Sequence, residues 1–267
     1  MNIERLRKII EYSDLNREAM NAKIKDFYSF SGMSSDKEVL NIMQIARPSF
    51  EKKGYLVLEL PFADEEIGAL CYKGDALGYI VLNTSLPKVN VNFAVCHELY
   101  HVFYQKSACK TEIEFTNEHY YEHEEEFAAN LFAGMLLMPE SGFRFMYSKF
   151  KKESAGKEKD TILRLMSYYQ APYMAVLIRC CELGLPDFDT ISEELLNTDQ
   201  DSIRQKFIDL WLDDSILNAT KKDDYLHLRT IIAHLGNEYI QDSYLNERTL
   251  KKVLQNMQIL YSEIKGT

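Results

Sequence analysis

Two histidines four residues apart constrain this chain more than any other feature of its sequence. They occur in the pentapeptide HELYH at residues 97–101, inside a run rich in apolar residues from 89 to 103. This run predicts a helix over about residues 90–105, and helical positions four apart share one face. Both imidazoles can then bind one metal ion, while Glu98 lies beside them as a general base for hydrolysis.

A catalytic zinc also needs a third protein ligand and an open position for water. The next predicted helix, residues 122–138, begins with several carboxylates. Glu126 is favoured because it shares a face with Ala129 and Ala133, which are small enough to let this helix approach the histidine helix closely. The pattern therefore predicts His97, His101 and Glu126 as the ligands.

The neighbouring residues leave one alternative open. Glu124 and Glu125 point away from the favoured face, and Glu122 shares it but lies one turn nearer the start of the helix. His123 is three residues before Glu126, and imidazole is also a good zinc ligand. The sequence alone does not exclude His123 as the third ligand.

Several polar residues near the motif are candidates for supporting roles. A hydrolase of this kind needs a second group that stabilises the oxyanion of the transition state, and its ligands need partners that orient them. Candidates for the first role are Tyr100, Tyr104, His119, Tyr120 and His123, and Asn130 is a candidate for the second.

A second motif extends the pattern. The segment EFAANLFAGMLLMP at residues 126–139, together with HELYH, resembles the ImmA/IrrE family of metallopeptidases, and the resemblance covers roughly residues 35–185. It implies one zinc ion per chain, bound by His97, His101 and Glu126 in a gluzincin-like hydrolase, with Glu98 as general base. It also implies a regulator of transcription, because the family includes enzymes that cleave helix-turn-helix repressors.

The remaining patterns predict an α+β protein with a zincin-like catalytic domain. Runs at 55–60, 68–72 and 78–82 predict a small, mostly antiparallel three-stranded sheet packed on helices. A helix is expected over residues 2–30. Another is expected from Ser35, where Ser35 and Glu38 have capping-box spacing, with a break or restart at Pro48 and an end at Gly54.

The predicted organisation has three parts. They are an N-terminal helix at 1–34, the metallopeptidase domain at 35–150, and an all-helical C-terminal domain at 151–267 with breaks near 171–172, 184–189 and 219–224. Residues 160–183 have the outline of a helix-turn-helix but few basic residues, which favours an ordinary helical hairpin. Apolar stripes in the last helices predict a bundle or, alternatively, a contact surface for a protein partner or a dimer.

Composition limits the partners and the compartment. The net charge of −10 opposes binding to nucleic acid, so the expected partner is a protein substrate. Five cysteines without a CxxC pair predict free thiols in a reducing cytosol. The chain shows no signal-peptide pattern and no run of 18 apolar residues, so a cytoplasmic protein without a membrane span is expected.

Three functions fit these patterns. The first is a zinc endopeptidase acting on a specific protein, for which a helix-turn-helix repressor is a candidate. The second is a zinc-containing regulatory or antitoxin-like binding module with little or no turnover, and the third is a small-molecule zinc hydrolase. Glu98 favours an enzyme, because a purely structural zinc site needs no base and usually fills all four positions with protein ligands.

Overall fold

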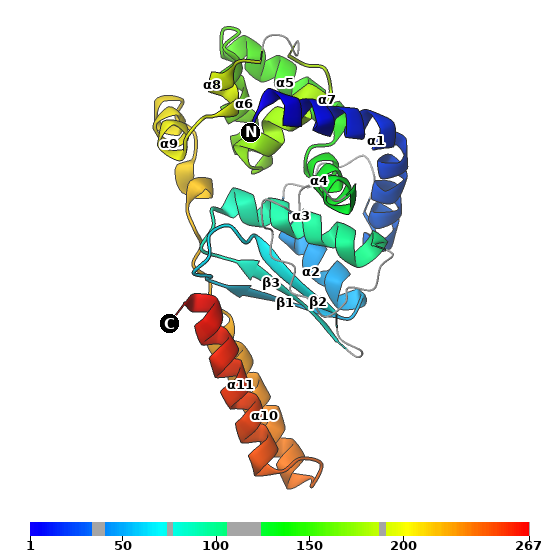
Figure 1. The fold of residues 1–267 in the computed structure, drawn as a ribbon, viewed down its shortest axis with the longest axis vertical. Coiled ribbons are helices and arrows are strands. Elements are labelled where there is room, and N and C mark those ends of the chain that lie inside the picture. The colour runs from blue at the N-terminus through cyan, green and yellow to red at the C-terminus, as the bar shows by residue number, and fades with distance from the viewer. Residues whose placement is uncertain (34–40, 74–76, 106–123, 187–190, 267) are drawn as a thin grey trace.

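The computed structural model describes residues 1–33, 41–73, 77–105, 124–186 and 191–266. Helices dominate these residues, with one small sheet near the middle of the molecule (Figure 1). In chain order the elements are α1 Ile3–Ser31, α2 Met43–Lys52, β1 Tyr55–Leu60, β2 Ala69–Lys73, β3 Gly78–Asn83, α3 Lys88–Tyr104, α4 Glu124–Leu137, α5 Glu140–Glu153, α6 Glu158–Tyr169, α7 Tyr173–Glu182, α8 Glu193–Leu196, α9 Gln200–Asp209, the 3-10 helix η3 Asp214–Leu217, α10 Tyr225–Gln241 and α11 Glu247–Lys265.

The three predicted strands are present, and the α+β class is confirmed, but the sheet is mixed rather than mostly antiparallel. Its strand order is β1-β3-β2. The β2–β3 pair is antiparallel, as a hairpin requires, whereas β1 pairs with β3 in parallel. The chain leaves β1 and crosses to the far edge before β2, so β3 returns between them in the direction of β1. At the start of β3, Gly78 faces Tyr55, whose ring would lie 2.4 Å from any added Cβ.

The helix before the sheet, α2, differs from its prediction at Pro48. It begins at Met43, and the expected start at Ser35 lies outside the described residues. Pro48 lies inside α2 and does not break it. Proline in a helix interior costs one backbone hydrogen bond, and here burial of the Phe50 side chain (0% exposed) helps to hold α2 in place.

The two helices that carry the predicted ligands pack directly on each other. α3 lies between the sheet and α4, and α1 runs across α4 from the other side (Figure 1). Because α3 is covered on both sides, it is apolar nearly all round, with Val95 and Leu99 fully buried. Ala129 and Ala133 of α4 are 0% exposed, so the close approach of the helices expected from these small residues is present.

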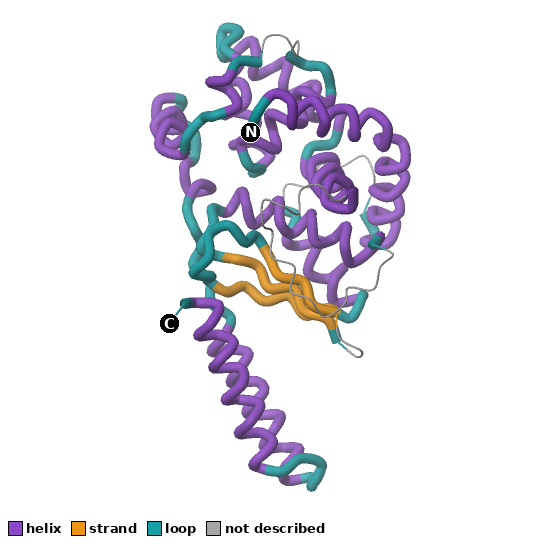
Figure 2. The backbone as a smooth tube through the Cα atoms, viewed as in Figure 1, coloured by secondary structure: helices purple, strands orange, loops and turns teal. Residues whose placement is uncertain are grey.

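One hydrophobic core joins most of the molecule. It extends from Leu6 in α1 to Ile216 in η3, so it runs across both predicted domain edges, at 34/35 and 150/151. The α10–α11 hairpin projects away from this body (Figures 1 and 2) and is joined at its base to β1 through a smaller cluster around Tyr225. None of the described helices combines the length and apolarity needed to cross a bilayer.

Candidate metal centre

α3 and α4 bring the three predicted ligands into one cluster. The Nε2 atoms of His97 and His101 are 2.9 Å apart. The Glu126 carboxylate reaches both imidazoles, with Oε2 3.2 Å from Nε2 of His97 and Oε1 3.5 Å from Nε2 of His101. The three side chains are 10–15% exposed, so the cluster lies at the edge of the core with limited access to solvent.

These distances fit a tetrahedral metal ion. Two ligand atoms that are each about 2.0–2.1 Å from a tetrahedral zinc lie about 3.3 Å from one another. The observed separations of 2.9, 3.2 and 3.5 Å bracket that value. All three ligand atoms lie within 4.8 Å of one another, and this is the candidate cluster that the described residues contain.

Two amide side chains set the orientation of the imidazoles. Nδ1 of His97 lies 3.0 Å from Oδ1 of Asn130, and Nδ1 of His101 lies 2.8 Å from Oε1 of Gln105. An amide oxygen only accepts, so each Nδ1 carries the proton and each Nε2 presents a lone pair. Three acceptor atoms therefore converge on one point, which is an arrangement that suits a cation.

Protonation of the two histidines is unequal. Burial alone would lower the pKa of His97, but its hydrogen bond to Glu126, the negative charges of Glu126 and Glu98, and the contact with Asn130 together raise it. Burial and the neighbouring His97 lower the pKa of His101 to about 4. A proton bound at this cluster therefore resides on His97, and a metal ion must displace it.

Glu98 has the position expected of a base next to the ligands. It follows His97 on α3 and is 8% exposed. Its carboxylate is close enough to His97 to raise the pKa of that imidazole. The site thus combines three candidate ligands with a second carboxylate, that of Glu98, which is not one of the three.

The comparison with protein families agrees with this geometry. The model of the IrrE N-terminal-like domain, Peptidase_M78, matches residues 50–180. This segment is an IrrE N-terminal-like domain. No curated protein matches the chain. Residues 50–180 are therefore a domain of the Peptidase_M78 family of metallopeptidases, and the histidine–histidine–glutamate cluster is the candidate metal site of this IrrE-like domain.

Two tyrosines predicted as transition-state donors in the IrrE-like domain face α1 instead. Nζ of Lys23 donates to the Tyr100 hydroxyl over 2.9 Å, and the Tyr104 hydroxyl donates to the Lys23 carbonyl over 2.5 Å. The hydroxyl proton of Tyr104 is therefore engaged in a hydrogen bond to the backbone of α1. The Tyr100 ring is 4% exposed, so it is packed inside the protein rather than presented to a substrate.

Three predicted site residues lie outside the part of the chain that the structure describes, and one residue of the site was missed by the sequence analysis. His119, Tyr120 and His123 lie outside the described residues, so the alternative ligand His123 is not placed. Gln105, the partner of His101, was not predicted. It lies four residues after His101, directly after the end of α3, and this four-residue spacing is the signal that could have identified it.

Removal of the amide side chain that orients His97 should weaken metal binding in the IrrE-like domain. Asn130→Ala removes the acceptor for Nδ1 of His97, so that imidazole loses its fixed tautomer and orientation. We expect zinc affinity to fall by about 10–100-fold, as is typical for outer partners of metal ligands. Competition with a chromophoric chelator measures the change. Gln258→Ala, on α11, is the matched control, and equal affinity of Asn130→Ala and wild type would contradict the assignment.

The different pKa shifts of His97 and His101 predict how metal binding depends on pH. The raised pKa of His97 means that one proton competes with the metal as pH falls through that value, so affinity should drop by about tenfold per pH unit. A second proton, on His101, should compete only near pH 4. Titration of the metal-free protein with zinc between about pH 5 and pH 8 measures the slope. A zinc affinity that stays constant across this range would be inconsistent with this expectation.

Proposed function

We propose that this protein is a zinc-dependent endopeptidase that hydrolyses peptide bonds in a specific protein substrate, with a helix-turn-helix repressor as the candidate substrate. The observation that carries the proposal is the convergence of His97, His101 and Glu126 with the Glu98 carboxylate beside them. A structural zinc site would not need that extra carboxylate.

Zinc is the metal that this donor set suits best. Two imidazole nitrogens and one carboxylate oxygen are the ligands of many catalytic zinc sites, and the separations match tetrahedral coordination. With three protein ligands in the described cluster, one tetrahedral position is left for water or substrate. When bound, zinc lowers the pKa of a bound water towards about 7 and polarises the scissile carbonyl.

The protein's own residues supply the remaining steps. The Glu98 carboxylate takes a proton from the attacking water and later gives it to the nitrogen of the leaving amine. Asn130 and Gln105 hold the two imidazoles in the orientation that presents Nε2. The buried walls of α3 and α4 limit water around the reacting groups, which strengthens electrostatic interactions there.

Charge supports a protein rather than a nucleic acid as the substrate. The chain carries a net charge of −10, which repels a phosphate backbone. A DNA-binding repressor presents basic surfaces that would be attracted to such a field. We therefore propose that the protein acts on such a repressor in the cytoplasm and not on its DNA.

The test is cleavage by the purified full-length chain. We would measure bound zinc by mass spectrometry, then incubate the zinc-loaded protein with the repressors encoded near its gene and analyse the fragments. We expect one defined cut that requires zinc and disappears with a chelator. Stable binding of a repressor without any cut would instead show a binding module, and cleavage of small amides or esters alone would show a small-molecule hydrolase.

A further inference from the structure

The hairpin formed by α10 and α11 extends away from the rest of the molecule (Figures 1 and 2). Its base packs on the sheet through Tyr225, Met257 and Tyr261, and beyond the base the two helices pack mainly on each other. The rings of Tyr225 and Tyr261 stack with centroids 3.9 Å apart. Leu250 fills the space beside Gly236, where an added Cβ would lie 2.3 Å from Cδ1 of Leu250. These contacts fix which side of each helix points inward.

One side of the hairpin carries a groove with polar side chains on both helices. Asn237 lines this groove from α10 and Lys251 lines it from α11. Successive residues of a helix are about 100° apart, so the two neighbours of an inward residue lie on opposite sides of the hairpin. Leu235 is therefore on the side opposite Asn237, because Gly236 between them points to α11. The same rule places Thr249 opposite Lys251 and so on the side of Leu235.

The side of the hairpin that carries Leu235 and Thr249 is apolar. Helical spacing adds the residues four positions from Leu235 in both directions, the residue four after Thr249, and the residue seven after that one. We call the resulting set the apolar face, and its members are 40–56% exposed: Ile231, Leu235, Tyr239, Val253 and Leu260. Single exposed apolar residues are common, but a continuous apolar patch on two adjacent helices is typical of an interaction site.

The middle of both helices carries no formal charge. Residues 230–237 and 253–262 contain no Asp, Glu, Lys or Arg, although these residues make up 27% of the chain. Protein interfaces are depleted of charged residues at their centre. The hairpin, residues 225–265, has five basic and four acidic side chains and is thus nearly neutral, in a chain with a net charge of −10. Two copies of this chain therefore repel each other least at the hairpin.

Charges at the rim of the apolar face complement those of a second copy. Glu238 on α10 and Lys252 on α11 lie at its outer edges, each two residues from the level at which Gly236 and Leu250 meet. Within one chain, the described residues give Lys252 no ion pair and bring Glu238 only to the His234 imidazole, at 3.6 Å. If α10 packs on α11 of a second copy, these outer edges meet. Glu238 then faces Lys252 of the other copy, and two-fold symmetry forms this pair twice.

The apolar face has about the size that a dimer needs. α10 is 17 residues long. The face is therefore about 25 Å long and, across two helices, about 20 Å wide, which is about 500 Å² in projection. A stable interface covers about 600–1,000 Å² of accessible surface on each partner, and the accessible surface of a ridged helix face exceeds its projection. Two copies of the face thus match a small interface of the standard class.

We propose that the chain forms a homodimer through the apolar face of the α10–α11 hairpin. The two hairpins associate as a four-helix bundle, with α10 of each copy packed on α11 of the other. Contact with a second face of the same kind removes apolar side chains of both copies from water, which is the main driving force for association.

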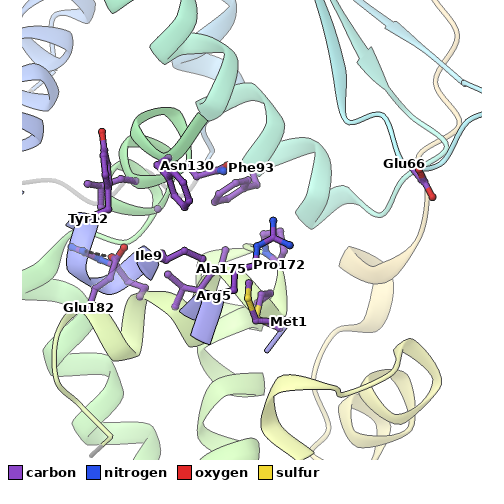
Figure 3. Close-up of a pocket in the computed structure, with 16 residues that line it drawn as sticks. Met1, Arg5, Ile9, Tyr12, Glu66, Phe93, Asn130, Pro172, Ala175 and Glu182 are labelled. Atoms are coloured by element: carbon purple, nitrogen blue, oxygen red, sulfur yellow. Dashed lines mark hydrogen bonds and ion pairs between the residues drawn. The ribbon is translucent and has the colours of Figure 1, made fainter. Parts of the chain in front are cut away.

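The proposed interface lies away from the metal centre. Leu70 and Val81 belong to the cluster at the base of the hairpin, whereas Ile80 is buried on the other face of the sheet, which α3 covers. The cavity between α1, α3, α4 and α7 (Figure 3) is lined by none of the described residues of α10 and α11. Dimerisation should therefore leave zinc affinity unchanged, and this affinity serves as a control for the folding of each variant.

The test is the molar mass of the full-length chain in solution. We would measure it by sedimentation velocity between about 1 and 100 μM. We expect the wild type to approach twice the mass of one chain, which is 31.1 kDa. Leu235→Glu and Leu260→Glu each place a carboxylate in the interface twice, so each should weaken the dimer by about 100-fold or more.

Two sets of variants test the side of the hairpin and the arrangement of the helices. Gln255→Glu adds the same charge on the groove side and should leave the dimer intact. Glu238→Lys and Lys252→Glu should each weaken the dimer by about 2–10-fold, because each breaks both copies of a rim ion pair. The double variant restores the pairs with opposite sign and should recover the affinity of the wild type.

The outcomes decide the proposal at two levels. A wild-type chain that stays monomeric at the highest concentration overturns it, even if the hairpin binds a different protein. A dimer that persists in both Leu235→Glu and Leu260→Glu overturns it as well. If the double charge exchange stays as weak as the single variants, the packing of α10 on α11 of the second copy is wrong. Circular dichroism and unchanged zinc affinity would show that the variants are folded.

Discussion

Glu98→Gln should abolish peptide cleavage while leaving the metal in place. Glutamine has nearly the same size as glutamate but cannot accept the proton of the attacking water. Loss of a general base typically costs about 10²–10⁴-fold in rate. His97, His101 and Glu126, which form the cluster, are unchanged in this variant, so zinc content and zinc affinity should remain close to those of the wild type.

The comparison needs both measurements on the same preparation. Zinc content, by mass spectrometry, shows whether the site is intact, and the rate of cleavage of a protein substrate shows whether the base is needed. Glu125→Gln is the matched control because Glu125 is an exposed glutamate near the cluster. If Glu98→Gln keeps its full biological effect, the protein acts by binding and the endopeptidase proposal fails.

Glu126→Gln should cause the largest loss of metal affinity among single substitutions in α4. It replaces a carboxylate that lies 3.2 and 3.5 Å from the two imidazoles with a neutral amide. The loss should exceed the about 10–100-fold expected for an outer partner such as Asn130, because Glu126 is itself a predicted ligand and supplies its negative charge. Chelator competition measures both affinities, and activity should fall in parallel with zinc occupancy.

Glu126→Gln also tests whether Glu126 or His123 is the third ligand. If His123 rather than Glu126 binds the metal, His123→Ala should lose zinc and Glu126→Gln should keep it. Our assignment requires the reverse order of effects. Glu124→Gln serves as the control on the same helix, since Glu124 is exposed at the start of α4.

The metal centre could be predicted because each of its parts leaves a local signal. The four-residue spacing of His97 and His101 defines one helix face, and Ala129 and Ala133 mark the face of α4 that packs closely on it. Local spacing of this kind survives folding, because a helix fixes which residues lie together.

Features that depend on long-range contacts could not be predicted in this way. The parallel pairing of β1 with β3 follows from a crossover that no strand pattern reveals. Lys23 forms hydrogen bonds with the hydroxyls of Tyr100 and Tyr104, and nothing near residue 23 indicates partners 77 and 81 residues away. The proximity of these tyrosines to the histidine motif suggested a role at the metal, whereas their hydroxyls are oriented by contacts with α1.

The path of α1 has a consequence for synthesis of the protein on the ribosome. Arg17 of α1 donates to the carbonyl of Glu182, which is 165 residues later in the chain. At typical elongation rates of about 5–20 residues per second, on the order of 10–30 s separate the appearance of these two partners. During that interval the apolar face of α1, with Leu6, Met20 and Phe27, lacks part of the surface that covers it in the finished protein. The nascent chain is therefore expected to depend on chaperones until α7 has emerged.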